Sequence, residues 1–121
     1  MGQRVYKYSR KTVGINLSST NIPSSFYLYQ NYPNPFNPSS KIKFDITRDA
    51  KRETLASRSG QDVTLIVYDA LGKETATLVN KNLSAGSYEV EFNGRDLSSG
   101  IYFYKLETGN FSEVKRMILL K

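Results

Sequence analysis

The side chains most often used for acid–base and nucleophilic catalysis are missing from this sequence, because its 121 residues include neither histidine nor cysteine. Without an imidazole or a thiol, neither a Ser-His-Asp nor a Cys-His triad can form. The nitrogen and sulfur ligands of a zinc site are missing for the same reason. One acidic pair, Glu89 and Glu91, lies on a single predicted strand face. Two carboxylates about 7 Å apart could hydrolyse a glycoside, but such pairs usually form a solvated face. We therefore predict that the chain is not an enzyme.

Oxygen ligands remain, and calcium prefers them. Five acids could gather at one end of a domain, namely Asp45, Asp49, Glu53, Asp62 and Asp69. No loop has the dense acidic spacing of a calcium motif, so we predict neither a metal nor a cofactor.

The most specific feature of the sequence is a run of prolines and asparagines that contains two aromatic residues. It consists of Tyr32, Pro33, Asn34, Pro35, Phe36, Asn37 and Pro38. Each proline fixes its own φ and keeps the preceding residue out of the helical region. Asparagine before proline can close a turn with its side chain. We therefore predict a stiff stretch that either caps the core or presents a preformed recognition surface, which loses little entropy on binding.

A second candidate for recognition is the basic and apolar segment Lys115–Lys121, whose charge comes from Lys115, Arg116 and Lys121. It is either an ordinary last strand or an exposed edge with a basic end and a free carboxylate that a receptor can bind.

The elements that must position these segments are β-strands. Alternating apolar and polar residues predict strands over residues 41–46, 63–68, 73–79, 87–92, 101–108 and 111–120, with a connection over 80–87. Glycines mark the predicted turns at Gly72, Gly86 and Gly100, and Gly72 suits a positive φ. The last proline is Pro38, which leaves the later residues free to pair. We predict an all-β fold, an Ig-like antiparallel sandwich of two sheets and about seven strands.

The net charge of +6 is concentrated in the leading residues, because residues 1–20 contain four basic side chains and no acid. The remainder is close to balanced, so we predict no nucleic-acid partner. No run of about 18 apolar residues exists, which argues against membrane insertion, and the leading residues lack the apolar core of a signal peptide. We predict a linker that is flexible by its polar composition over residues 1–21, and one folded domain over 22–121.

Five segments in order carry a family resemblance. They are Tyr-Pro-Asn-Pro-Phe-Asn-Pro at 32–38, Tyr-Asp-Ala-Leu-Gly-Lys-Glu at 68–74, Ala-Gly-Ser-Tyr at 85–88, Leu-Ser-Ser-Gly-Ile-Tyr-Phe-Tyr-Lys-Leu at 97–106 and Lys-Arg-Met-Ile-Leu-Leu-Lys at 115–121. Together they resemble the type A C-terminal sorting domain of the type IX secretion system. The last four segments also suit the related Ig-like domain of flagellar hook-capping proteins, and the proline motif favours the sorting domain.

The resemblance implies a sorting signal for a cargo domain missing from this sequence, of which residues 1–21 would be the tail or linker. An outer-membrane translocon of Bacteroidetes-type bacteria would recognise the folded domain after export to the periplasm. A sortase-like cysteine peptidase would cut within residues 10–25, which leaves the cargo at the cell surface or in the medium. The alternative is a structural Ig-like or fibronectin-like module of a surface enzyme that binds glycans, for which Tyr102 and Tyr104 would be the stacking pair.

Overall fold

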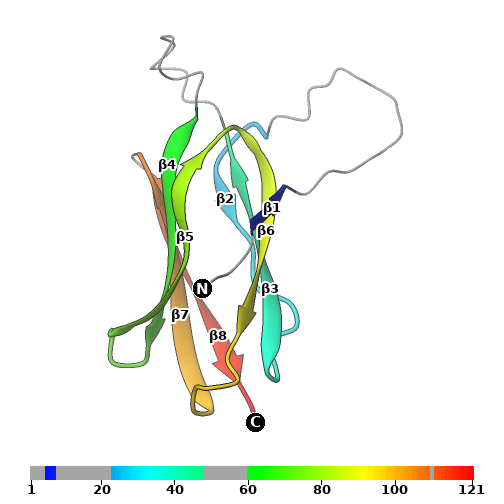
Figure 1. The fold of residues 1–121 in the computed structure, drawn as a ribbon, viewed down its shortest axis with the longest axis vertical. Helices are drawn as coiled ribbons and strands as arrows, with labels where there is room; N and C mark the ends of the chain where they lie inside the picture. Colours follow the sequence, from blue (N-terminus) through cyan, green and yellow to red (C-terminus); the bar gives the residue numbers. More distant parts are fainter. Residues whose placement is uncertain (1–4, 8–22, 48–59, 110) are drawn as a thin grey trace, which may run out of the picture.

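The computed structural model describes residues 5–7, 23–47, 60–109 and 111–121, and these residues form eight strands. The strands are β1 (Val5–Lys7), β2 (Tyr27–Leu28), β3 (Ser39–Ile46), β4 (Gln61–Asp69), β5 (Glu74–Leu83), β6 (Gly86–Asn93), β7 (Gly100–Thr108) and β8 (Phe111–Leu119). Their order is β1-β6-β3-β2 in sheet A and β5-β4-β7-β8 in sheet B. Figure 1 shows the sheets as two facing layers. The predicted all-β sandwich of two antiparallel sheets is confirmed.

The side-chain alternation read from the sequence places one face of each sheet in the core. In β3, the side chains of Ile42, Phe44 and Ile46 are fully buried, whereas the intervening polar residues face outward. β4 lies between β5 and β7, as a strand with few charges should, and it buries Val63 and Val67. Each such side chain contributes about 1.5–3 kcal/mol on full burial.

The buried apolar residues extend in sequence from Leu28 to Leu119 and form one cluster between the sheets. Aromatic rings also pack against each other within it: Phe44 and Tyr88, which are paired across β3 and β6, stack with ring centroids 5.6 Å apart. The described residues contain no helix of the length and apolar character needed to cross a bilayer.

The turn between β4 and β5 is built by Asp69. Its Oδ1 accepts the N–H groups of Leu71 and Lys73, each at 2.9 Å. Gly72 donates its N–H to the Asp69 carbonyl and has a φ of 87°, which is a left-handed conformation that glycine adopts without strain. The other two glycines from the sequence, Gly86 and Gly100, are the first residues of β6 and β7.

β5 extends well beyond its predicted end. β5 continues to Leu83 instead of ending near residue 79, because Asn82 and Leu83 still pair with Asp62 and Gln61. The Asn82 side chain also donates to the Asp62 carboxylate at 3.2 Å. The connection to β6 is therefore much shorter than expected and crosses from one sheet to the other (Figure 1).

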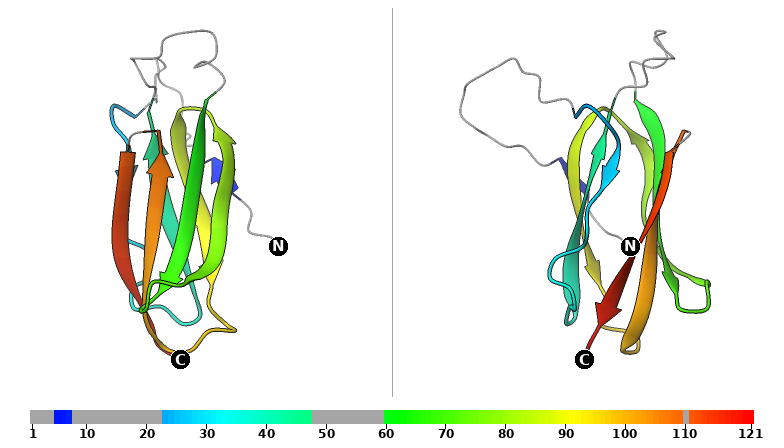
Figure 2. Two further views of the ribbon diagram at one scale, coloured as in Figure 1. Left: turned by 90° about the vertical axis from the view of Figure 1, so that its left-hand side faces the viewer. Right: turned by 180° about the vertical axis from the view of Figure 1, so that it is seen from behind.

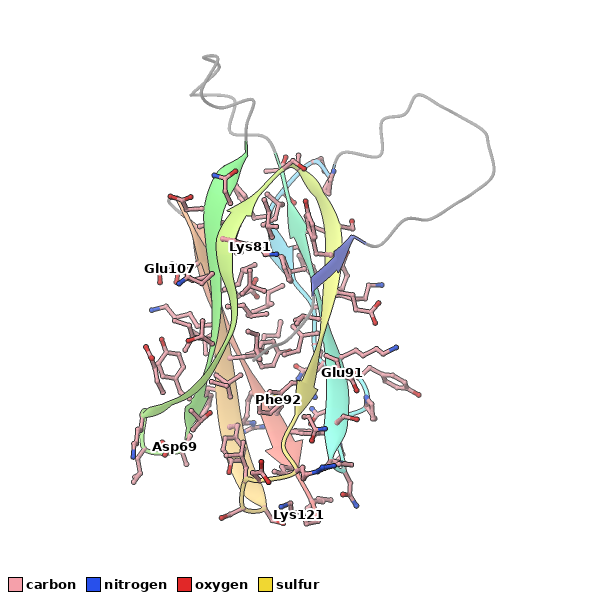
Figure 3. The ribbon with its side chains drawn as sticks, in the orientation of Figure 1. Asp69, Lys81, Glu91, Phe92, Glu107 and Lys121 are labelled. Carbon is pink, nitrogen blue, oxygen red and sulfur yellow. The ribbon has the colours of Figure 1, made fainter. Side chains whose placement is uncertain are left out.

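The sandwich has two distinct ends. One end carries the β4–β5 turn, the connection from β6 to β7, and the end of β8 (Figure 2). The β5–β6 connection and the turn between β7 and β8 lie at the other end. Figure 3 accordingly shows Asp69 and Lys121 at one end, with Lys81 and Glu107 displaced toward the other.

Candidate recognition surface

The segment Tyr32–Pro38, here called the strap, lies along the outer edge of β8. The Phe36 N–H donates to the Ile118 carbonyl (2.9 Å), and the Leu120 N–H donates to the Phe36 carbonyl (3.0 Å). The Asn34 side chain extends this ladder, since its Oδ1 accepts the Ile118 N–H at 3.0 Å across 84 residues of sequence. The fold thus brings the two motifs singled out from the sequence into direct contact.

The side chain of Phe36 belongs to the core. It is 1% exposed, and its ring meets the ring of Phe92 edge to face with centroids 5.9 Å apart. Gly94 leaves the room for this contact, because a Cβ at that position would lie 3.0 Å from Leu119 and 3.4 Å from the Phe36 ring. Phe36 therefore fastens the strap to the sandwich and offers little surface to a partner.

Tyr32 lies in the opposite environment, with 80% of its surface exposed. Its backbone is fixed to β3 by two hydrogen bonds with Lys41, at 3.0 and 2.9 Å. The neighbouring strap residues face solvent as well: Pro33, Asn34, Pro35 and Asn37 are exposed, and Pro38 is half-buried. The strap consequently displays one aromatic ring and several polar or proline side chains from a fixed backbone.

A buried polar network beneath the strap holds its shape. Asn31 and Ser40 are each 2% exposed. The Asn31 Nδ2 donates to the Pro33 carbonyl (3.0 Å) and to the Ser40 hydroxyl (2.9 Å). The Ser40 hydroxyl in turn donates to the Pro33 carbonyl at 2.8 Å. Because buried polar groups are costly when unpaired, this network favours one strap conformation.

Tyr104 connects the strap to sheet B. Its hydroxyl donates to the Tyr29 carbonyl and accepts the Asn31 N–H, both at 2.8 Å. Burial raises the pKa of Tyr104 well above its usual range, because the phenolate would be desolvated. Gln30 adds a further connection, since its Nε2 donates to the Arg116 carbonyl at 2.7 Å.

The last residues of the chain include side chains buried in the core and side chains exposed to solvent. Met117 and Leu119 are fully buried, whereas Leu120 is half exposed. Arg116 faces solvent, and the Lys121 Nζ donates to the Arg95 carbonyl at 2.6 Å. Lys115 points to the other side of β8, and its Nζ lies 3.5 Å from the Glu113 carboxylate. Arg116 and Lys121 are therefore the solvent-exposed basic side chains in the last residues of the chain.

Sequence reasoning missed the residues that hold the strap in place: Gln30, Asn31, Ser40 and Tyr104. A polar residue directly before a proline-rich run was an available signal for Asn31, but no pattern indicated its partners. Tyr104 and Tyr102, the pair that would have stacked on a glycan, are buried. Their hydroxyls bond to backbone carbonyls instead, at Tyr29 and at Ser98.

The acidic residues considered for catalysis or calcium binding do not form a site: some are paired with other side chains, and others lie far from one another. Asp45 accepts the hydroxyls of Tyr29 and Ser87, each at 2.8 Å. Asp62 and Asp69 stand near opposite ends of β4, and residues 49 and 53 lie outside the described part of the chain. Glu89 lies 3.6 Å from the Lys41 Nζ on the outer face of sheet A. The described residues contain no group of three acids that could hold a metal ion.

The fold and the strap define a β-sandwich module that displays a preorganised surface. The chain belongs to the family described as the secretion system C-terminal sorting domain, which it matches over residues 30–120. This confirms the resemblance to the type IX sorting domain. A search of curated proteins gives no match. The domain is thus a type IX secretion signal, and the protein that carries it is exported to the cell surface or the extracellular space.

Proposed function

We propose that the outer-membrane translocon recognises a composite surface made of the strap and the end of β8. This surface comprises Tyr32 and the exposed strap residues together with Arg116, Leu120 and Lys121. The observation that carries the proposal is the direct pairing of the strap with β8, which joins two distant motifs into one surface.

Preorganisation supports this assignment. The backbone of the strap is fixed by β8 on one side and by the Asn31 network on the other. A partner that binds such a surface has little of the strap backbone left to order, so more of the contact energy appears as affinity. The exposed ring of Tyr32 and the guanidinium of Arg116 are side-chain types that often dominate binding energy.

We further propose that a sortase-like cysteine peptidase separates the domain from its cargo within residues 10–25. Pro23 lies just beyond the end of β3 at Ile46, where its carbonyl accepts the Thr47 hydroxyl at 2.7 Å, whereas the strap leads into the opposite end of β3 at Ser39. A peptidase at the linker and a receptor at the composite surface could therefore bind at the same time.

The test fuses residues 1–121 to a periplasmic reporter in a bacterium that has this secretion system. The variants Tyr32→Ala and Arg116→Ala alter exposed side chains of the composite surface. Deleting residues 115–121 is unsuitable, because it would also remove the core residues Met117 and Leu119. We expect the double variant to lower secreted reporter at least tenfold while thermal unfolding stays cooperative.

Two matched controls locate the effect. Lys81→Ala removes an exposed cation at a distance from Lys121 along the sandwich (Figure 3), and Tyr27→Ala removes a half-exposed tyrosine. Both should secrete like the parent. Equal secretion by the double variant and the controls would contradict the composite surface, although the domain could still be a sorting signal through another face.

A further inference from the structure

The outer edge of β6 differs from the other sheet edges of the molecule. On one side, β6 pairs with β3 over its whole length in unbroken register, from Gly86↔Ile46 to Asn93↔Ser39. On the other side it pairs with β1 over three positions, from Tyr88↔Lys7 to Val90↔Val5. An eight-residue regular strand is therefore covered by a three-residue one.

The remaining edges carry features that discourage pairing. β5 has two register irregularities opposite β4, and bulges twist an edge away from new partners. The strap blocks the end of β8, and near the start of that strand the Phe111 ring stacks on Phe26 at 5.2 Å. β2 is only two residues long. Within the described residues, β6 is the regular edge whose protection depends on a separate short segment.

The segment that covers β6 lies outside the part of the chain that matches the family. The match begins at residue 30, whereas β1 ends at Lys7. Its connection to the sheet runs through backbone pairing, which any extended segment could provide. A three-residue pairing of this kind is weak, so we expect β1 to detach and return readily.

We propose that the edge of β6 is a strand-accepting site, occupied in the intact chain by β1 and open to the amino-terminal segment of a second copy when β1 is absent. The atoms that would bind are the backbone amides and carbonyls of Tyr88–Val90, which β1 now uses. The added strand would extend sheet A and pair with β6 in the register that β1 has now.

Charge complementarity favours this occupant over direct pairing of two β6 edges. β6 carries Glu89 and Glu91 on its outer face, and within the described residues no cation lies within ion-pair distance of Glu91. Residues 1–20 contain four basic side chains and no acid. Two β6 strands side by side would bring four carboxylates close together, which is destabilising, whereas a basic segment reduces that repulsion.

Part of this inference rests on the proposed function. A cut within residues 10–25 would leave β1 on the cargo fragment and free the β6 edge of the sorting domain. The site itself does not depend on the cut, because it can be measured with the purified chain. Its failure would leave sorting and cleavage unaffected, and a failure of cleavage would leave the site unaffected.

The experiment uses the full chain with β1 disabled. Successive strand residues direct their N–H groups to opposite sides, so the pair Val5→Pro and Tyr6→Pro removes a donor that faces β6 whichever residue supplies it. The probe is a fluorescent peptide with the sequence of residues 1–12, followed by anisotropy. We expect saturable binding to the double-proline chain at least tenfold tighter than to the parent chain.

Two controls separate strand addition from charge attraction. A peptide with the two prolines keeps all the basic side chains but loses the backbone donors, and it should fail to bind. A peptide with Val5→Thr and Tyr6→Thr should bind within about threefold of the parent peptide, because threonine favours strands and the pairing is carried by the backbone. Cooperative thermal unfolding of the double-proline chain confirms that it is folded. Equal binding to both chains, or binding of the two-proline peptide with the same affinity as the parent peptide, would overturn the proposal.

Discussion

The aromatic residues in and beneath the strap have two different roles: the buried ones stabilise the fold, and the exposed one is available to a partner. Phe36 and Tyr104 are buried and attach the strap to the sandwich, through a ring contact and through two hydrogen bonds respectively. Tyr32 is exposed and makes its strand contact through the backbone. Substitutions of the buried and exposed residues should therefore have separable effects on stability and on secretion.

Phe36→Ala should lower the free energy of unfolding by about 3–5 kcal/mol, because it leaves a cavity against Phe92. Tyr32→Ala should change it by less than about 0.5 kcal/mol, since the ring is mostly in water. Denaturant titration followed by circular dichroism measures both. A similar loss for the two variants would show that the assigned environments are wrong.

Because of Tyr104, the free energy of unfolding should fall as the pH rises into the alkaline range. Burial raises its pKa in the folded chain above the ordinary 10.0, so the folded state retains a proton that the unfolded state loses. This contribution is complete below about pH 10 and is lost as the pH rises through the folded-state pKa. Tyr104→Phe should be less stable at pH 7, by about 1–3 kcal/mol from the unpaired Asn31 N–H.

The same variant should lose less stability than the parent between pH 9 and pH 11, because it no longer carries the buried phenol. Chemical unfolding at a series of pH values compares the two slopes. Parallel slopes would mean that Tyr104 does not retain its proton in the folded chain.

At the scale of elements, the sequence predicts strands from their local alternation, but it does not predict contacts between segments that are far apart in the chain. The alternation in β3 identified Ile42, Phe44 and Ile46 as core residues, because strand geometry alone sends them to one face. The strap has no such period. Its docking on β8 depends on partners such as Ile118 and Tyr104, far away in sequence, and only the assembled fold identifies them.

The β4–β5 turn is a local element that the sequence predicted correctly, including the positive φ of Gly72. Gly72→Ala should lower the free energy of unfolding by about 1 kcal/mol through its positive φ alone, because the space beside it is open. Gly72→Asn should cost less, since asparagine tolerates this conformation. Thermal unfolding of both variants gives the comparison, and an alanine variant as stable as the parent would contradict the assigned turn.

At the scale of the whole molecule, the length of the sandwich separates the proposed recognition surface from the proposed cleavage site. The end of β8 lies at one end of the sandwich (Figure 2), and Pro23 lies beside Thr47, beyond the other end of β3 from the strap. The sequence indicated both motifs and the two-sheet fold, but their shared surface follows from the way sheet B brings β8 against the strap. Recognition and cleavage would then take place toward opposite ends of the sandwich.

The most direct measurement places a photo-crosslinking amino acid at position 32 of the full chain, fused to its reporter in secreting cells. The matched chain carries it at position 81, where the native side chain is exposed but distant from the end of β8 (Figure 3). Irradiation should yield a covalent adduct with an outer-membrane component of the translocon from position 32 and not from position 81. Secretion of both chains with equal adducts, or with an adduct from position 81 alone, would contradict recognition through the composite surface.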